Sequence, residues 1–180
     1  YVLSIGRLEQ KKNTLGLVQA FTQLQKRYRG ELTLVLAGTP GYQFEKVQEF
    51  IAAHHLGDAV RCTGYVSPAD LPALLNQAAL FAFPSHYEGF GLPILEAQAC
   101  GVPVVTSTVA SMPEVAGAGA VLVDPRNPEE IADGMMRILD DPSFAASLKE
   151  AGRRNVTRFT WENCAQETLA TLHKTVLGVA

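Results

Sequence analysis

The sequence predicts an α/β fold: an open parallel sheet of six strands with helices on both faces, followed by an all-helical carboxyl-terminal segment. Three observations support this prediction. Short apolar runs alternate with longer segments of helical periodicity as far as Pro125. Glycine or proline closes most of these runs, as is typical where a strand leads into a loop. From Pro128 onward the periodicity is helical only.

Six segments have the composition of buried parallel strands. Such strands carry apolar side chains on both sides, because helices cover both faces of the sheet. The predicted strands are residues 1–5, 31–37, 60–63, 80–83, 102–106 and 118–123.

Helices are predicted between these strands and after the last of them. Asn13 or Thr14 is expected to cap the first helix and Thr160 the last. Ser67 is expected to cap the third, with Pro68 at its first position. The predicted helices are residues 14–28, 43–55, from 68, 92–100, a short one led by 111–114, 128–140, 143–158 and 161–177.

The composition bounds the class of protein. A chain of 180 residues, 47% of them hydrophobic, is expected to form one domain with a sizeable core. The net charge of −3 argues against a nucleic-acid partner, which would require a basic face. The three cysteines, Cys62, Cys100 and Cys164, are too widely spaced for a disulfide framework or a zinc site, which favours a reducing cytoplasm.

The ends of the chain and its apolar runs suggest a part of a cytoplasmic protein. No apolar run approaches the roughly 18 residues of a membrane span, and no signal peptide is recognisable. The sequence starts without Met, directly in a strand-like segment. We therefore expect a piece of a longer protein, with any membrane association peripheral, at the inner face, and made by the rest of that protein.

Residues 84–105 carry the strongest functional signal. Gly89 and Gly91 lie in a loop after a predicted strand, and Pro93 opens the next helix. Glycines lack a Cβ atom, so the backbone N–H groups near Gly91 and Leu92 are expected to be open to an anion. A phosphate suits such a helix start.

Two carboxylates, Glu88 and Glu96, flank this helix start. On one unbroken helix they would lie about 12 Å apart along the axis, too far to hold one atom. Carboxylates accept hydrogen bonds from hydroxyl groups, so the pair suits two ends of one long sugar-containing ligand. The structural alternative is that Glu88 complements the helix dipole while Glu96 is a solvated residue.

The segment Glu88-Gly-Phe-Gly-Leu-Pro-x-x-Glu96, with the following Gly101-Val-Pro-Val-Val105, resembles the E-x7-E motif of a known family. This family is the retaining nucleotide-sugar glycosyltransferases of the two-domain GT-B fold, family 4, also called glycosyltransferase group 1. Gly6-Arg7-Leu8 with Lys12-Asn13 resembles the family's Gly-Arg-Leu-x-x-x-Lys-Asn loop, which holds the donor diphosphate. The resemblance covers nearly the whole chain.

The resemblance implies a fold and a role. Residues 1–180 would form a single Rossmann-like domain, the carboxyl-terminal, donor-binding half of a GT-B enzyme, with the amino-terminal acceptor domain absent. The intact enzyme would transfer a hexosyl group of the mannose or glucose type, with retention, from a UDP- or GDP-sugar, or an ADP-sugar, to an acceptor hydroxyl. Neither a cofactor nor a metal is implied, and cell-surface polysaccharide biosynthesis is the expected context. This half alone is expected to bind donor and to turn it over poorly.

The resemblance also implies roles for individual residues. Glu88, Arg7 and Lys12 would be catalytic, with Glu88 on the transferred sugar, and Glu96 would hold the ribose. The implied donor-binding residues are Gly6, Arg7, Lys12, Gly38, Tyr65, Val66, Glu88, Gly89, Phe90, Gly91, Leu92 and Glu96.

Charge balance supports part of this set independently. A helix start supplies about half a positive charge, less than a diphosphate requires, and no Asp-x-Asp pair follows a strand to hold a metal. Arg7 and Lys12 are the expected substitutes, with Lys11 as an alternative to Lys12. Each could instead be an ordinary solvated loop residue. Tyr65 is interpreted either as part of the base site or as a core aromatic residue.

Two other functions remain open at this point. One is a non-catalytic nucleotide-binding or regulatory module. The other is a GT-B nucleotide-sugar epimerase, although epimerases do not usually carry the Glu-Gly-Phe-Gly-Leu-Pro sequence.

Overall fold

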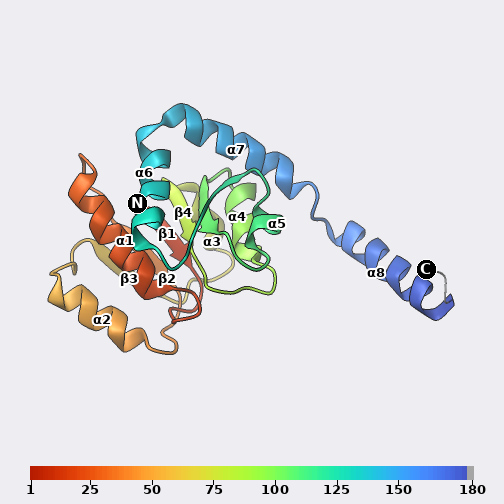
Figure 1. Ribbon diagram of the computed structural model, residues 1–180, viewed down its shortest axis with the longest axis horizontal. Helices are drawn as coiled ribbons and strands as arrows, with labels where there is room; N and C mark the ends of the chain where they lie inside the picture. Colours follow the sequence, from red (N-terminus) through yellow and green to blue (C-terminus); the bar gives the residue numbers. More distant parts are fainter. Residues whose placement is uncertain (178–180) are drawn as a thin grey trace.

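The computed structural model describes residues 1–177, which form a parallel sheet between two layers of helices and a last helix that extends away from them (Figure 1). The strands are β1 (Val2–Ile5), β2 (Leu34–Ala37), β3 (Val60–Gly64), β4 (Leu80–Phe83), β5 (Val104–Ser107) and β6 (Ala120–Val123). The helices are α1 (Thr14–Arg27), α2 (Phe44–Ala53), α3 (Leu71–Asn76), α4 (Leu92–Ala99), α5 (Met112–Ala116), α6 (Pro128–Asp140), α7 (Pro142–Val156) and α8 (Trp161–Leu177).

The sheet has the strand order β3-β2-β1-β4-β5-β6, and every pair of neighbouring strands is parallel. This confirms the predicted α/β fold with an open six-stranded parallel sheet. The order reverses direction between β1 and β4, so the loops that follow these two strands leave the same sheet edge side by side. Ligands of open α/β sheets bind at such a switch point.

Two separate cores cover the two faces of the sheet. Successive side chains of β4 alternate between them: Leu80 and Ala82 belong to the core under α1, α2 and α6, and Phe81 and Phe83 to the core under α4 and α5. Helices on both faces are therefore confirmed, and both cores hold β4 in place. The loop after β4 consequently starts from a rigid position.

Several predicted boundaries and caps differ from the structure. The segment 31–33 precedes β2, and β5 begins at Val104 rather than at residue 102. The predicted cap at Ser67 is wrong: its hydroxyl donates to the Asp70 carboxylate at 2.7 Å, and α3 begins only at Leu71. The predicted cap at Thr160 is confirmed, because its hydroxyl oxygen accepts the N–H of Asn163 at 3.0 Å.

Helix α8 differs from the rest of the described chain. Residues 161–176 are all exposed, including Trp161 with an exposed fraction of 82%. Figure 1 shows α8 beyond the end of α7, away from the sheet. Among the helices of residues 1–177, none is long and apolar enough to cross a membrane.

Candidate functional site

The loops after β1 and β4 are joined by a backbone hydrogen bond. The N–H of His86 donates to the carbonyl oxygen of Lys11 at 2.9 Å. The loop after β2 adds to the same edge, since the N–H of Gly41 donates to Leu8 at 2.9 Å. The carboxyl ends of β1, β2 and β4 thus carry one connected surface, as is typical of an open parallel sheet.

Asn13 holds the loops after three strands together. It is 6% exposed, and its backbone is left-handed with φ 56°. Its side-chain amide donates to the carbonyl oxygens of Pro84 at 3.1 Å and Pro125 at 2.6 Å, so it does not cap α1 as predicted. Gly16 makes room for it, because a Cβ atom there would lie 2.3 Å from the Asn13 side chain. That glycine in the first turn of an amphipathic helix was the available sequence signal.

Lys12 and Glu88 form an ion pair across the switch point. Lys12 Nζ lies 2.6 Å from Glu88 Oε1, and the side chains are 22% and 9% exposed. Lys11 is exposed, so Lys12 is the lysine that the fold directs toward Glu88. The ammonium group has three hydrogens, and the pair leaves it able to donate to a ligand as well.

The glycine loop leads into α4 with its first amide group free. Gly91 is the N-cap of α4 with φ 106°, a conformation that favours glycine. Within residues 1–177 the N–H of Leu92 has no hydrogen-bond partner. Ser111, which the sequence analysis missed, steadies this loop: its Oγ lies 3.0 Å from the Glu88 carbonyl oxygen and 2.7 Å from that of Phe90.

Glu96 has a different environment from Glu88. It is exposed on the second turn of α4, and its carboxylate has no partner among the described residues. One turn further along, burial of Cys100 and the nearby Glu96 carboxylate both raise the pKa of the Cys100 thiol. The structure of Glu96 alone fits the alternative of a solvated helix residue. For Glu88, the ion pair with Lys12 contradicts the alternative that it only complements the helix dipole.

Arg7 lies in the loop after β1 and is largely exposed. Its Nε is 3.6 Å from the Glu9 carboxylate, and its side chain is 65% exposed. The neighbouring loops are in close contact, because a Cβ atom at Gly38 would lie 1.8 Å from the Gly6 carbonyl oxygen. Gly38 therefore allows the loops after β1 and β2 to meet.

The predicted base site lies at the end of β3. Gly38 pairs with Gly64 in an isolated bridge, which brings the loops after β2 and β3 together. Tyr65 follows directly and is 73% exposed, while Val66 is half-buried. The interpretation of Tyr65 as a core aromatic residue is therefore wrong.

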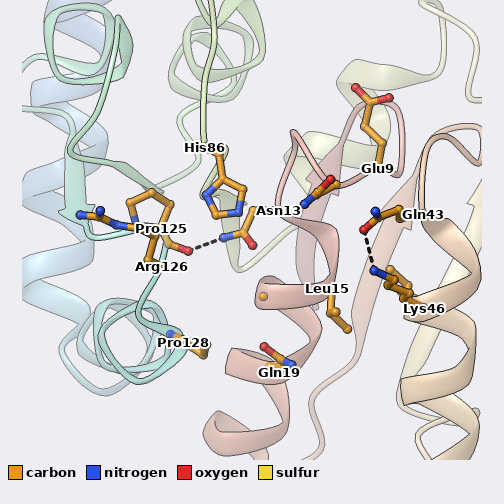
Figure 2. A pocket seen from close by; sticks show the side chains of 13 residues that line it. Glu9, Asn13, Leu15, Gln19, Gln43, Lys46, His86, Pro125, Arg126 and Pro128 are labelled. Carbon is orange, nitrogen blue, oxygen red and sulfur yellow. Dashed lines mark hydrogen bonds between the residues drawn. The ribbon is translucent and has the colours of Figure 1, made fainter.

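A hollow of about 410 Å³ lies beside the start of α1 (Figure 2). It is lined by Glu9, Gln10, Asn13, Leu15, Gly16, Gln19, Gln43, Lys46, Val47, His86, Pro125, Arg126 and Pro128. Four of the predicted donor-binding residues, Arg7, Lys12, Glu88 and Glu96, do not line it. Residues 1–177 contain no group of three or more His, Cys, Asp or Glu side chains arranged to hold a metal.

A family model and a relative of known family both match most of this chain. The family model described as "Glycosyl transferases group 1" matches residues 1–155. O-antigen chain mannosyltransferase B of Escherichia coli is 39% identical over 169 residues, which are 94% of this chain and 44% of that protein.

Two solved structures extend the similarity to the fold. Sucrose-phosphate synthase from Thermosynechococcus elongatus aligns with TM-score 0.83 and 30% identity over 99% of this chain and 46% of that one. HepE from Anabaena, in complex with UDP and glucose, aligns with TM-score 0.84 and 25% identity over 96% and 47%. The chain spans less than half the length of each of these three proteins.

Proposed function

Because the chain belongs to the glycosyl transferases group 1 family, with the GT-B fold of its structural neighbours, we propose that it binds the nucleotide-sugar donor of a retaining hexosyltransferase. One observation carries the proposal: the Lys12–Glu88 ion pair joins the loop after β1 to the loop after β4, and the second loop ends in the free N–H at the start of α4. The transferred sugar is of the mannose or glucose type, supported by the mannosyltransferase relative and the glucose bound to HepE.

The diphosphate is placed at the start of α4. The N–H of Leu92 and the positive end of the helix dipole attract it, and Lys12 and Arg7 supply the further positive charge that it needs. Each of these cations also has a carboxylate neighbour, Glu9 at 3.6 Å from Arg7 and Glu88 at 2.6 Å from Lys12. No metal is required in this arrangement.

Lys12 and Arg7 assist transfer by binding the leaving group more tightly as its negative charge grows. The bond between the anomeric carbon and the phosphate oxygen breaks, and its electron pair stays on the diphosphate. The acceptor oxygen bonds to that carbon on the face that the diphosphate leaves, and its proton passes to a phosphate oxygen. Lys12, Arg7 and the Leu92 N–H stabilise this transition state, and Glu88 orients the sugar through its hydroxyl groups.

The nucleoside is placed on the other side of the diphosphate. Glu96 accepts hydrogen bonds from the ribose hydroxyls, and Gly38, Tyr65 and Val66 form the base site. UDP is supported by the HepE complex, and GDP and ADP remain candidates. We further propose an acceptor domain outside these residues and a cytoplasmic location with at most peripheral membrane contact. The proposed role is polysaccharide synthesis, which the name of the E. coli relative supports.

A screen of nucleotides by thermal shift tests the proposal. Residues 1–180 are heated with UDP, GDP or ADP and with the corresponding glucose or mannose conjugates. One nucleotide class is expected to raise Tm, because a ligand at about 100 times its Kd stabilises the native state by about 2.7 kcal/mol. The variant Lys12→Met should lose this shift. No shift with any of these compounds would refute donor binding.

A further inference from the structure

A second hollow, of about 340 Å³, adjoins the one in Figure 2. Its lining residues are Glu9, Gln10, Lys11, Tyr42 and His86, and three of them, Glu9, Gln10 and His86, also line the first hollow. The two hollows therefore form one groove, which we call the α1 groove. It passes over the start of α1, from Tyr42 before α2 to Arg126 before α6.

The α1 groove is distinct from the proposed donor site but touches it. None of Arg7, Lys12, Glu88 and Glu96 lines either hollow. Lys11 and His86, however, are close in sequence to Lys12 and Glu88, and their backbones are hydrogen-bonded to each other at 2.9 Å. A ligand in this groove would thus end next to the ion pair that is proposed to hold the reacting sugar.

Two charged side chains of the groove, Arg126 and Glu9, are paired with opposite charges of the protein, whereas Lys11 and Lys46 form no ion pair with described residues. Lys46 donates to Gln43 at 3.0 Å, as Figure 2 shows, and Arg126 donates to Asp124 at 3.1 and 3.3 Å. Glu9 faces Arg7 at 3.6 Å. The hydrogen bond to the neutral Gln43 leaves the charge of Lys46 in place, so the groove presents the charges of Lys46 and of the exposed Lys11 beside its uncharged polar groups.

The uncharged polar groups of the groove suit a hydroxyl-rich ligand. The side-chain amides of Gln10 and Gln19 form no hydrogen bond with described residues and can both donate and accept. The ring of Tyr42 is 69% exposed and offers a flat apolar face with a hydroxyl at its end. A sugar ring presents the complementary surface, an apolar C–H face edged by hydroxyl groups.

The groove is also longer than one sugar ring. It crosses the starts of α2, α1 and α6, and packed helices lie about 8–10 Å apart, so its span is on the order of 16–20 Å. Gly16 lines the groove, and a Cβ atom there would collide with the Asn13 side chain. Several linked sugar units fit this length.

We propose that the α1 groove binds the acceptor saccharide chain, with Tyr42 stacking on one sugar ring and Gln10 and Gln19 hydrogen-bonding to hydroxyl groups. The inference rests on the proposed function, because it takes the end of the groove near His86 to lead to the transferred sugar. It assigns part of acceptor recognition to the same domain that binds the donor.

The test is an NMR titration of residues 1–180 with two neutral probes, α-linked mannotriose and maltotriose, with and without the nucleotide found by thermal shift. One probe is expected to move the amide signals of Gln10, Gln19, Tyr42 and His86. The variant Tyr42→Ala should weaken its binding about tenfold, which equals about 1.4 kcal/mol. The control Trp161→Ala, an exposed aromatic residue on α8, should leave it unchanged.

The outcomes separate this inference from the proposed function. No signal change with either probe at about 10 mM, or changes confined to Tyr65 and Glu96, would overturn the groove assignment. Equal probe affinity for Tyr42→Ala and the unaltered chain would overturn it too. Tyr42→Ala should bind the nucleotide normally, and failure of every variant to bind nucleotide would count against the proposed function while leaving the titration result valid.

Discussion

The two ends of the proposed donor site differ in how much the protein itself holds them. At the sugar and phosphate end, Glu88 is 8% exposed and paired with Lys12, and Asn13 and Ser111 fix the loops that carry the pair. At the nucleoside end, Glu96 and Tyr65 are exposed and lack such support. The end where bonds are expected to break is therefore pre-organised, whereas the other end supplies binding groups that only a ligand brings together.

The largest effect on this difference is expected from Asn13→Asp. The change removes the two hydrogen bonds to Pro84 and Pro125 and turns a carboxylate toward both carbonyl oxygens at a buried position. We expect the free energy of unfolding to fall by about 3 kcal/mol or more, measured by urea denaturation. The matched control is Asn127→Asp, whose side-chain oxygen only accepts hydrogen bonds, from Glu129 and Glu130. If both variants were equally stable, Asn13 would not hold the loops.

The contrast between Asn13 and the strands also shows what the sequence could predict. The parallel sheet and both helix layers could be predicted from the apolar runs, because the apolar residues of a run indicate directly that the run is buried. Lys12 and Glu88 were assigned to one donor site by the motifs that contain them, but their ion pair was not predicted. The Asn13 amide and the Ser111 hydroxyl contact carbonyl groups 112 and 23 residues away, and a carbonyl group leaves no trace in a sequence. The α1 groove depends on how side chains pack, so it could not be predicted from the sequence either.

A smaller effect on stability is expected from Glu88→Gln. The amide oxygen still accepts a hydrogen bond from Lys12, but the half-buried ammonium loses its counter-charge, which should cost about 1 kcal/mol in a denaturation experiment. Calorimetric titration should show at least a tenfold loss of affinity for the nucleotide-sugar and a much smaller loss for the free nucleotide. The matched variant Glu96→Gln should retain full stability. An equal loss of both ligands would contradict the placement of Glu88 on the sugar.

Glu96→Ala should weaken nucleotide binding without weakening the fold. We expect the Kd of the nucleotide to rise ten- to hundredfold, equivalent to roughly 1.4 to 2.8 kcal/mol, with stability within about 0.5 kcal/mol. Glu114→Ala, another exposed glutamate in the first turn of α5, is the control and should change neither quantity. Unchanged nucleotide affinity for Glu96→Ala in calorimetry would remove Glu96 from the site.

The smallest effect is expected at an exposed pair that forms between neighbours in the sequence, Asp124 and Arg126. The Arg126 side chain, which donates to Asp124, lowers the pKa of that carboxyl below its ordinary value, with a further contribution from the Arg126 backbone N–H. Because the folded-state pKa is depressed, the pair stabilises the protein above the ordinary pKa of Asp. That stabilisation is lost as the pH falls through the folded-state value, below about pH 4.

Asp124→Asn should therefore lower stability slightly at neutral pH and make the acid-side decline less steep, which denaturation curves between neutral and acid pH can measure. Arg126 remains in the α1 groove, and the loss of its partner leaves its charge free. An anionic ligand should then bind the groove better, whereas a neutral saccharide should bind as before. A local exposed pair thus adjusts the charge of the groove at little cost in stability, unlike the Lys12–Glu88 pair, whose two partners lie 76 residues apart and hold the loops together.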